Sequence, residues 1–166
     1  MFEQFGEMGS AAEINLLADN LVLEGDFESV KKLAAENGID SGDVEDYLAG
    51  DMAELCNDLT AAIGKIELEA KELGLKELME DWVEWIKAEC TVKTDDGYVF
   101  ARNVRAKGKT LAGALGAILK KSWEIKWKIP EKIVKAAGVS GARVEFGIPG
   151  TATLRKIINE YYGGIK

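Results

Sequence analysis

Apolar residues recur every three or four positions along most of the chain, in segments that end at glycine. This spacing places apolar side chains on one face of a helix. Glycine readily adopts the left-handed conformation that ends a helix. The first 90 residues therefore predict consecutive helices with short glycine breaks between them, each turning an apolar face toward a core.

Side chains that accept hydrogen bonds from free backbone N–H groups mark where these helices begin. Ser10 and Glu13 have the spacing of a capping box. The predicted starts are Ser10, Asp26, Asp40 or Ser41, and Asp51, the predicted ends are Gly25, Asn37-Gly38, Gly50 and Gly74, and a fifth helix follows Gly74. The predicted apolar faces are Ile14, Leu17, Ala18 and Leu21; Phe27, Val30, Leu33 and Ala34; Val44, Tyr47 and Leu48; Met52, Leu55, Cys56, Leu59, Ala62, Ile63, Ile66 and Ala70; and Leu75, Leu78, Met79, Trp82, Trp85, Ile86 and Cys90.

The pattern changes after a predicted turn at Lys93–Gly97. A helix is predicted from Leu111 to Ser122, and the alternation from Trp123 to Ile129 favours a strand with its tryptophans packed inward. Trp123 and Trp127 also fit one face of a helix. A second strand is predicted at Val144–Ile148, and a last helix from Thr151 or Thr153 to Gly163-Gly164. The expected fold is α+β and mainly α-helical, with an N-terminal helical bundle and a small two-stranded β element near the C-terminus.

Charge divides the chain into two regions. Residues 1–90 contain 23 Asp and Glu against 6 Lys and Arg, whereas residues 91–166 contain 6 against 15. We expect an acidic helical region at 1–92 and a basic helical region with short strands at 93–166, within one compact unit. An acidic field attracts a basic partner and repels nucleic acid. The candidate partner-binding residues come from an acidic stretch without Lys or Arg: Glu36, Asp40, Asp43, Glu45, Asp46, Asp51, Glu54 and Asp58.

The absence of histidine argues against catalysis, because histidine is the commonest general base and zinc ligand. Two cysteines alone cannot form an ordinary structural zinc site. Cys56 and Cys90 are expected to be reduced core residues. We therefore expect no enzyme activity, metal or cofactor. The sequence from Met1 to Met8 lacks the features of a signal peptide, and Leu111–Leu119 is too short to span a bilayer, so a cytoplasmic protein is expected.

Gly108-Lys109-Thr110 matches the end of a phosphate-binding loop, but Asn103 stands where the first glycine of that motif is required. We interpret it as a basic turn before the Leu111 helix. Nearby basic residues, together with Trp123 and Trp127, suggest contact with nucleic acid or another partner. The acidic half opposes direct nucleic-acid binding. The other interpretation is that the basic residues neutralise the acidic half, within one molecule or between copies. The candidate basic residues are Arg102, Arg105, Lys107, Lys109, Lys126 and Lys128.

Four segments of the acidic half carry a resemblance to a known family: Glu13–Asn15, Glu24–Asp26, Leu33–Ile39 and Asp43–Tyr47. They resemble the N-terminal signature of a family of type II-A CRISPR inhibitors related to PcfK-like proteins of mobile elements. Ala106–Leu111 and Tyr161-Tyr162 are also similar, whereas Trp123–Ile148 does not match the family pattern. The resemblance covers about half of the chain.

This resemblance implies an anti-CRISPR protein that binds the RNA-guided DNA nuclease of type II systems inside the bacterial host cell. Such nucleases hold nucleic acid in positively charged channels, so an acidic helical surface is suited to act as a DNA mimic. The first alternative is a PcfK-like accessory protein of a conjugative plasmid or phage that binds DNA or a transfer protein through its basic half. The second is a scaffold that self-associates through its opposite charges.

Overall fold

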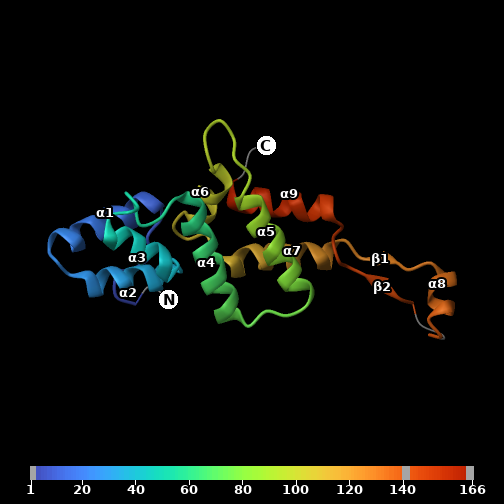
Figure 1. Ribbon diagram of the computed structural model, residues 1–166. Helices are drawn as coiled ribbons and strands as arrows, with labels where there is room; N and C mark the ends of the chain where they lie inside the picture. The colour runs from blue at the N-terminus through green and yellow to red at the C-terminus, as the bar shows by residue number, and fades with distance from the viewer. Residues whose placement is uncertain (1–2, 140–142, 164–166) are drawn as a thin grey trace.

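The computed structural model describes residues 3–139 and 143–163. Within these residues the chain forms nine helices and one two-stranded antiparallel sheet near the C-terminus (Figure 1). The prediction of a mainly helical α+β protein with a small β element is confirmed. The helices are α1 (Ala11–Leu23), α2 (Phe27–Asn37), α3 (Ser41–Ala49), α4 (Asp58–Leu73), α5 (Leu78–Cys90), α6 (Val99–Arg105), α7 (Leu111–Glu124), α8 (Glu131–Ala136) and α9 (Thr151–Tyr162), and the strands are β1 (Trp127–Lys128) and β2 (Glu145–Phe146).

Three parts follow one another along an elongated molecule (Figure 1). The N-terminal lobe, residues 3–57, contains α1, α2 and α3. The central body combines α4, α5, α6, α7 and α9. The arm, residues 125–150, carries β1, α8 and β2 and projects from the end of the body opposite the lobe (Figure 1). Within the described residues, no helix is long and apolar enough to cross a bilayer.

Local capping chemistry explains the boundaries of the first three helices. The Ser10 side chain accepts a hydrogen bond from the backbone N–H of Glu13, and Asp26 accepts one from Ser29. Asp40 caps α3 by accepting from Gly42. Gly38 ends α2 in the left-handed conformation. The predicted starts and ends of α1, α2 and α3 are therefore confirmed, although Phe27, predicted to be buried, is 49% exposed.

The predicted start of the fourth helix at Asp51 is wrong. Helix α4 begins at Asp58, because Asn57 forms a capping box with Thr60. Leu55 and Cys56 are nevertheless buried, as their apolar spacing suggested, but they lie in an irregular segment. Burial of these two side chains needed no helix.

Helix α6 was not predicted. It has only seven residues and no side-chain cap, so neither apolar periodicity nor a start signal distinguishes it in the sequence. It packs closely against α4 and α5 and buries Ala101, Val104 and Arg105. This short element is thus central to the body.

The strand predicted from Trp123 to Ile129 is much shorter in the structure. Helix α7 continues through Trp123 to Glu124, and only Trp127 and Lys128 form β1. Trp127 pairs with Phe146 of β2. The inward packing predicted for the tryptophans is wrong, since Trp123 is 68% and Trp127 45% exposed.

Two clusters of buried apolar side chains support the lobe and the body. The first extends from Met8 to Ala61 and the second from Ala62 to Tyr162. Helix α4 contributes to both, with Ala61 in the first cluster and Ala62 in the second. Cys56 and Cys90 are buried and free, as predicted. The arm adds no residue to either cluster among the described residues.

Candidate functional site

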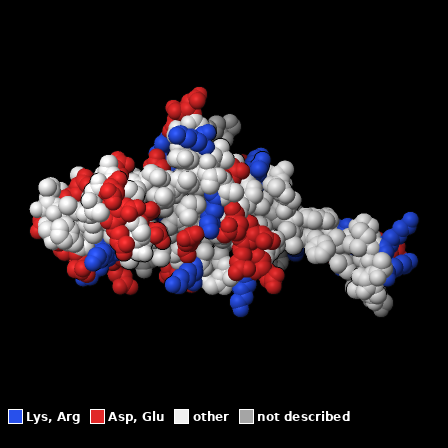
Figure 2. All heavy atoms as spheres, viewed as in Figure 1, with Lys and Arg blue, Asp and Glu red and all other residues white. Residues whose placement is uncertain are grey.

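Negative charge is concentrated on the lobe and on the adjoining face of the body (Figure 2). Three of the eight acidic candidates have structural roles there. Glu36 accepts hydrogen bonds from the backbone N–H groups of Gln4 (2.9 Å) and Phe5 (3.3 Å). Asp40 caps α3, and Asp58 forms a 3.1 Å ion pair with Arg102. These carboxylates hold the fold together.

The other five acidic candidates make no ion pair within the part of the chain that the structure describes. They lie on α3 and on the irregular segment between α3 and α4. Most are exposed, and Asp43 is partly exposed. We call them the acidic surface: Asp43, Glu45, Asp46, Asp51 and Glu54.

A shallow groove lies beside the acidic surface, between α2 and α3. Its volume is about 220 Å³. Glu45 of the acidic surface lines it together with Lys31 and Ser41. The apolar lining comes from Ala34, Ala35, Ile39, Val44 and Leu48. The lobe thus offers an apolar depression whose charged lining consists of Glu45 and Lys31.

Most basic candidates contact groups of the same chain. Lys107 forms a 3.1 Å ion pair with Glu13. Lys109 donates a 2.6 Å hydrogen bond to the carbonyl oxygen of Tyr161 and lies over its ring. Arg102 pairs with Asp58 and also donates to the carbonyl oxygen of Asp96. The Arg102 and Lys107 ion pairs link the acidic and basic halves within one molecule.

Arg105 is buried, with 1% of its surface exposed. It donates hydrogen bonds to the carbonyl oxygen of Ala61 and to the side-chain oxygen of Asn37. Burial lowers the pKa of the guanidinium, although the nearby Glu7 and Glu69 carboxylates act in the opposite direction. Arg105 therefore occupies a structural position inside the protein and is not available for surface contact.

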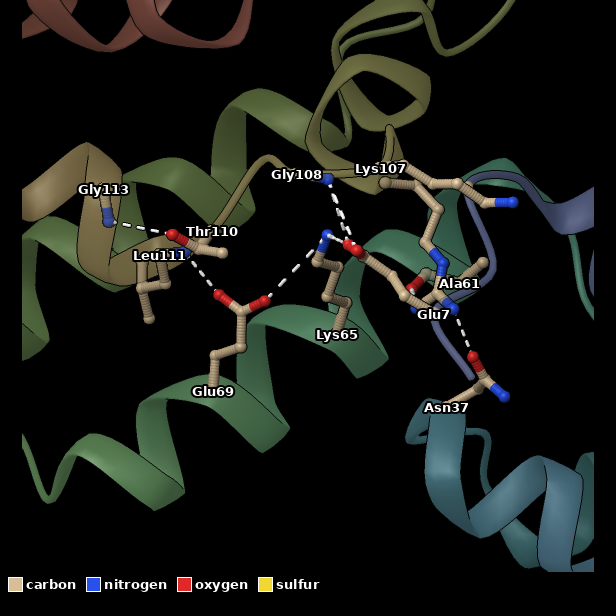
Figure 3. A network of polar contacts seen from close by, with 12 residues as sticks. Glu7, Asn37, Ala61, Lys65, Glu69, Lys107, Gly108, Thr110, Leu111 and Gly113 are labelled. Carbon is tan, nitrogen blue, oxygen red and sulfur yellow. Dashed lines mark hydrogen bonds and ion pairs between the residues drawn. The ribbon is translucent and has the colours of Figure 1, made fainter. Parts of the chain in front are cut away.

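A buried polar network joins α4 to the N-terminal segment and to the start of α7, and it was not recognised in the sequence (Figure 3). Lys65, 1% exposed, pairs with Glu7 at 3.1 Å and with Glu69 at 4.0 Å. Glu69 also accepts a hydrogen bond from the backbone N–H of Leu111, at the start of α7. Burial raises the pKa of Glu69, while the Leu111 N–H and Lys65 lower it. The four-residue spacing of Lys65 and Glu69 was the available signal.

The Gly108-Lys109-Thr110 segment is part of the same region (Figure 3). The Gly108 N–H donates to the carboxylate of Glu7 at 3.3 Å. Thr110 caps α7 by accepting from Gly113. In a phosphate-binding loop the amide groups face an anion supplied by the ligand, whereas here a side chain of the protein supplies it. The interpretation as a basic turn before the α7 helix agrees with this geometry.

Lys126 and Lys128 are the basic candidates that lie on the arm. Lys126 lies 4.5 Å from the centroid of the Trp123 ring, and Lys128 is exposed on β1. Within the described residues, no cluster of three or more Cys, Asp or Glu side chains is arranged to hold a metal ion. The geometry thus offers two exposed surfaces, the acidic surface with its groove and the arm.

Comparison of the chain with protein-family models, curated proteins and solved structures finds no match.

Proposed function

We propose that this chain is an inhibitor that binds the RNA-guided DNA nuclease of type II CRISPR systems in the bacterial cytoplasm. The acidic surface is the proposed contact. The observation that supports it most is the group of five carboxylates on α3 and the following segment that form no ion pair with any residue the structure describes. The resemblance of Glu24–Asp26, Leu33–Ile39 and Asp43–Tyr47 to CRISPR inhibitors of mobile elements supports the choice of nuclease.

The proposed mechanism is mimicry of DNA phosphates. Asp43 and Asp46 lie about one helical turn apart on α3, and one turn advances about 5.4 Å along the axis. Carboxylates at this interval resemble the phosphates along a DNA strand in charge and spacing. Positively charged channels that normally hold nucleic acid would accept them. The inhibitor would thereby compete with target DNA without catalysing a reaction.

Replacing Asp43, Glu45 and Asp46 by Asn, Gln and Asn tests the proposal. Asp40 is left intact because it caps α3. Affinity for the guide-loaded and the guide-free nuclease should fall steeply, mainly through a slower association rate, because complementary fields steer encounter. Binding by the unmodified protein should weaken with salt, since exposed charges are screened over about 8–10 Å at physiological ionic strength.

The matched control replaces Glu72, Asp81 and Asp95 by Gln, Asn and Asn. These exposed acids lie outside the lobe, so the control removes equal charge from other surfaces. It should retain binding and inhibition of DNA cleavage. Equal affinity of both folded variants, together with no effect of salt, would contradict DNA mimicry.

The alternative is an accessory protein of a conjugative plasmid or phage that binds DNA or a transfer protein through basic residues. It has less support, because Arg102, Arg105, Lys107 and Lys109 all contact groups of the same chain. A gel shift with single- and double-stranded DNA distinguishes the two functions. Tight DNA binding by the isolated protein would favour the alternative.

A further inference from the structure

The arm exposes an unusual amount of apolar surface. Seven of the fourteen large apolar side chains that are exposed in the described residues lie between 119 and 148, five of them on the arm and two at the end of α7. Helix α8 has no buried residue. Each strand of the arm is only two residues long. An isolated two-stranded ribbon is marginally stable in water. The seven exposed side chains are Leu119, Trp123, Trp127, Ile133, Val139, Phe146 and Ile148.

The register of the ribbon separates its apolar and charged side chains. Trp127 lies directly opposite Phe146, and Lys128 lies opposite Glu145. Because successive side chains in a strand point to opposite faces, the two aromatic rings share one face and the charged pair shares the other. A single-strand nucleic-acid platform combines stacking rings with a basic groove along the backbone. The aromatic face is better suited to apolar protein surface.

The groove between α2 and α3 provides such a surface, and its charge is complementary to that of the arm. The arm carries five Lys or Arg residues and two Glu residues. The groove is lined by apolar side chains such as Ile39 and Leu48, with Glu45 and Lys31 as its charged lining, and the lobe around it carries 14 Asp or Glu residues against two Lys. Figure 2 shows the corresponding contrast, with red over the lobe and a mostly white arm that is blue at its tip.

We propose that the arm of one chain packs its Trp127–Phe146 face into the α2–α3 groove of a second copy. The lobe and the arm lie at opposite ends of the molecule (Figure 1), so each arm reaches the other lobe when two copies lie antiparallel. Two equal contacts then form around a twofold axis, and the assembly closes as a dimer. This inference does not rest on nuclease inhibition.

The apolar area is sufficient for such a contact. A buried aromatic side chain covers about 150–250 Å². With two half-exposed aromatic rings and three half-exposed aliphatic side chains, each arm offers roughly 400 Å² of apolar surface. Two arms would bury roughly twice this area on the arm side alone, which is within reach of the ~1,600 Å² total of a standard interface.

Sedimentation velocity over a concentration series provides the test. The unmodified 18.1 kDa chain should form a dimer that weakens with salt. Changing Trp127 and Phe146 to Ser should raise the dimer dissociation constant by at least about tenfold, since aromatic anchors dominate interfaces. Leu73 and Val92, exposed on the body, are the matched control, and their change to Ser should leave the dimer intact. Circular dichroism must show that each variant is folded.

A charge exchange identifies the contacting surfaces. Lys126→Glu with Lys128→Glu changes the net charge of the arm from +3 to −1, and Asp43→Lys, Glu45→Lys and Asp46→Lys together change that of the acidic surface from −5 to +1. Each variant alone should be monomeric, and an equimolar mixture should dimerise, because every arm then meets a surface of opposite charge. A monomeric unmodified protein at all concentrations would overturn the proposal. A dimer that persists in the lobe variant would also overturn it, because the arms would then pair with each other. Binding of DNA by the arm of a monomeric protein would overturn it as well.

Discussion

Arg105 and Lys65 are long charged side chains that the fold buries almost completely. A buried charge is tolerated only with charged or hydrogen-bonding partners. Here the partners come from distant segments: Glu7 near the N-terminus, Asn37 at the end of α2 and Glu69 on α4. The network connects the lobe to the body and to the start of α7, so each member should affect the stability of the whole fold.

Replacing Arg105 by Ala should destabilise the protein by roughly 3–5 kcal/mol, because it leaves buried polar groups without their partner. Arg102 lies one helical turn earlier on α6 and is partly exposed, so Arg102→Ala should cost at most about 1 kcal/mol. Urea unfolding followed by circular dichroism measures both. Equal losses for the two variants would show that burial of Arg105 contributes little.

Helix α4 joins the two parts of the fold through a contact between backbones. A Cβ atom on Gly64 would lie 2.5 Å from the carbonyl oxygen of Asn37. The end of α2 therefore packs against α4 with no room for a side chain. The left-handed Gly38 lies at the same contact.

Gly64→Ala should destabilise the protein by about 1–3 kcal/mol, because neither backbone can move away without disturbing the packing. Gly116 of α7 is also helical, but nothing lies within 4 Å of its Cβ position. Gly116→Ala should stabilise the protein by about 0.5–1 kcal/mol through helix propensity. Thermal unfolding of both variants tests the prediction, and opposite shifts of the midpoint are expected.

Local signals predicted the helices of the lobe well. Ser10, Asp26 and Asp40 act within three residues along the chain, so their capping roles are visible in sequence. Helix α6 and the burial of Arg105 escaped prediction because they depend on distant partners, and Asn37 is 68 residues away. The prediction that Trp123 and Trp127 pack inward was wrong, because alternation separates the two faces of a strand but does not tell which face is covered.

The acidic surface was predicted only in part for the same reason. Charge identified the stretch from Glu36 to Asp58, but only the fold distinguishes structural from exposed carboxylates. Glu36 accepts backbone hydrogen bonds, and Asp58 pairs with Arg102, 44 residues later. Such pairings depend on how α4 and α6 are placed relative to each other.

The three parts of the molecule differ in how firmly they are held. The lobe and the body each have a cluster of fully buried side chains, whereas the arm has none in the described residues. Segments with few buried contacts open with low free energy. Of the parts that the structure describes, the arm is therefore expected to be the most accessible to a protease.

Trypsin should cut first within the arm of the monomeric protein, at Lys128, Lys132, Lys135 or Arg143. Lys65 and Arg105 should resist cleavage while the protein is folded, because both are buried. Mass spectrometry over a time course identifies the first fragments. An initial cut at Lys76, between α4 and α5, would indicate that the arm is more protected than its exposure suggests.

The uneven placement of tryptophan gives the protein an internal optical reporter. All four tryptophans lie at 82, 85, 123 and 127, and the lobe contains none. In the monomeric protein, a ligand that covers only the acidic surface should leave the emission spectrum unchanged. One that covers the ribbon removes water from Trp127 and should shift its emission to shorter wavelength. Intrinsic fluorescence can therefore tell, without labels, which end of the molecule a partner has engaged.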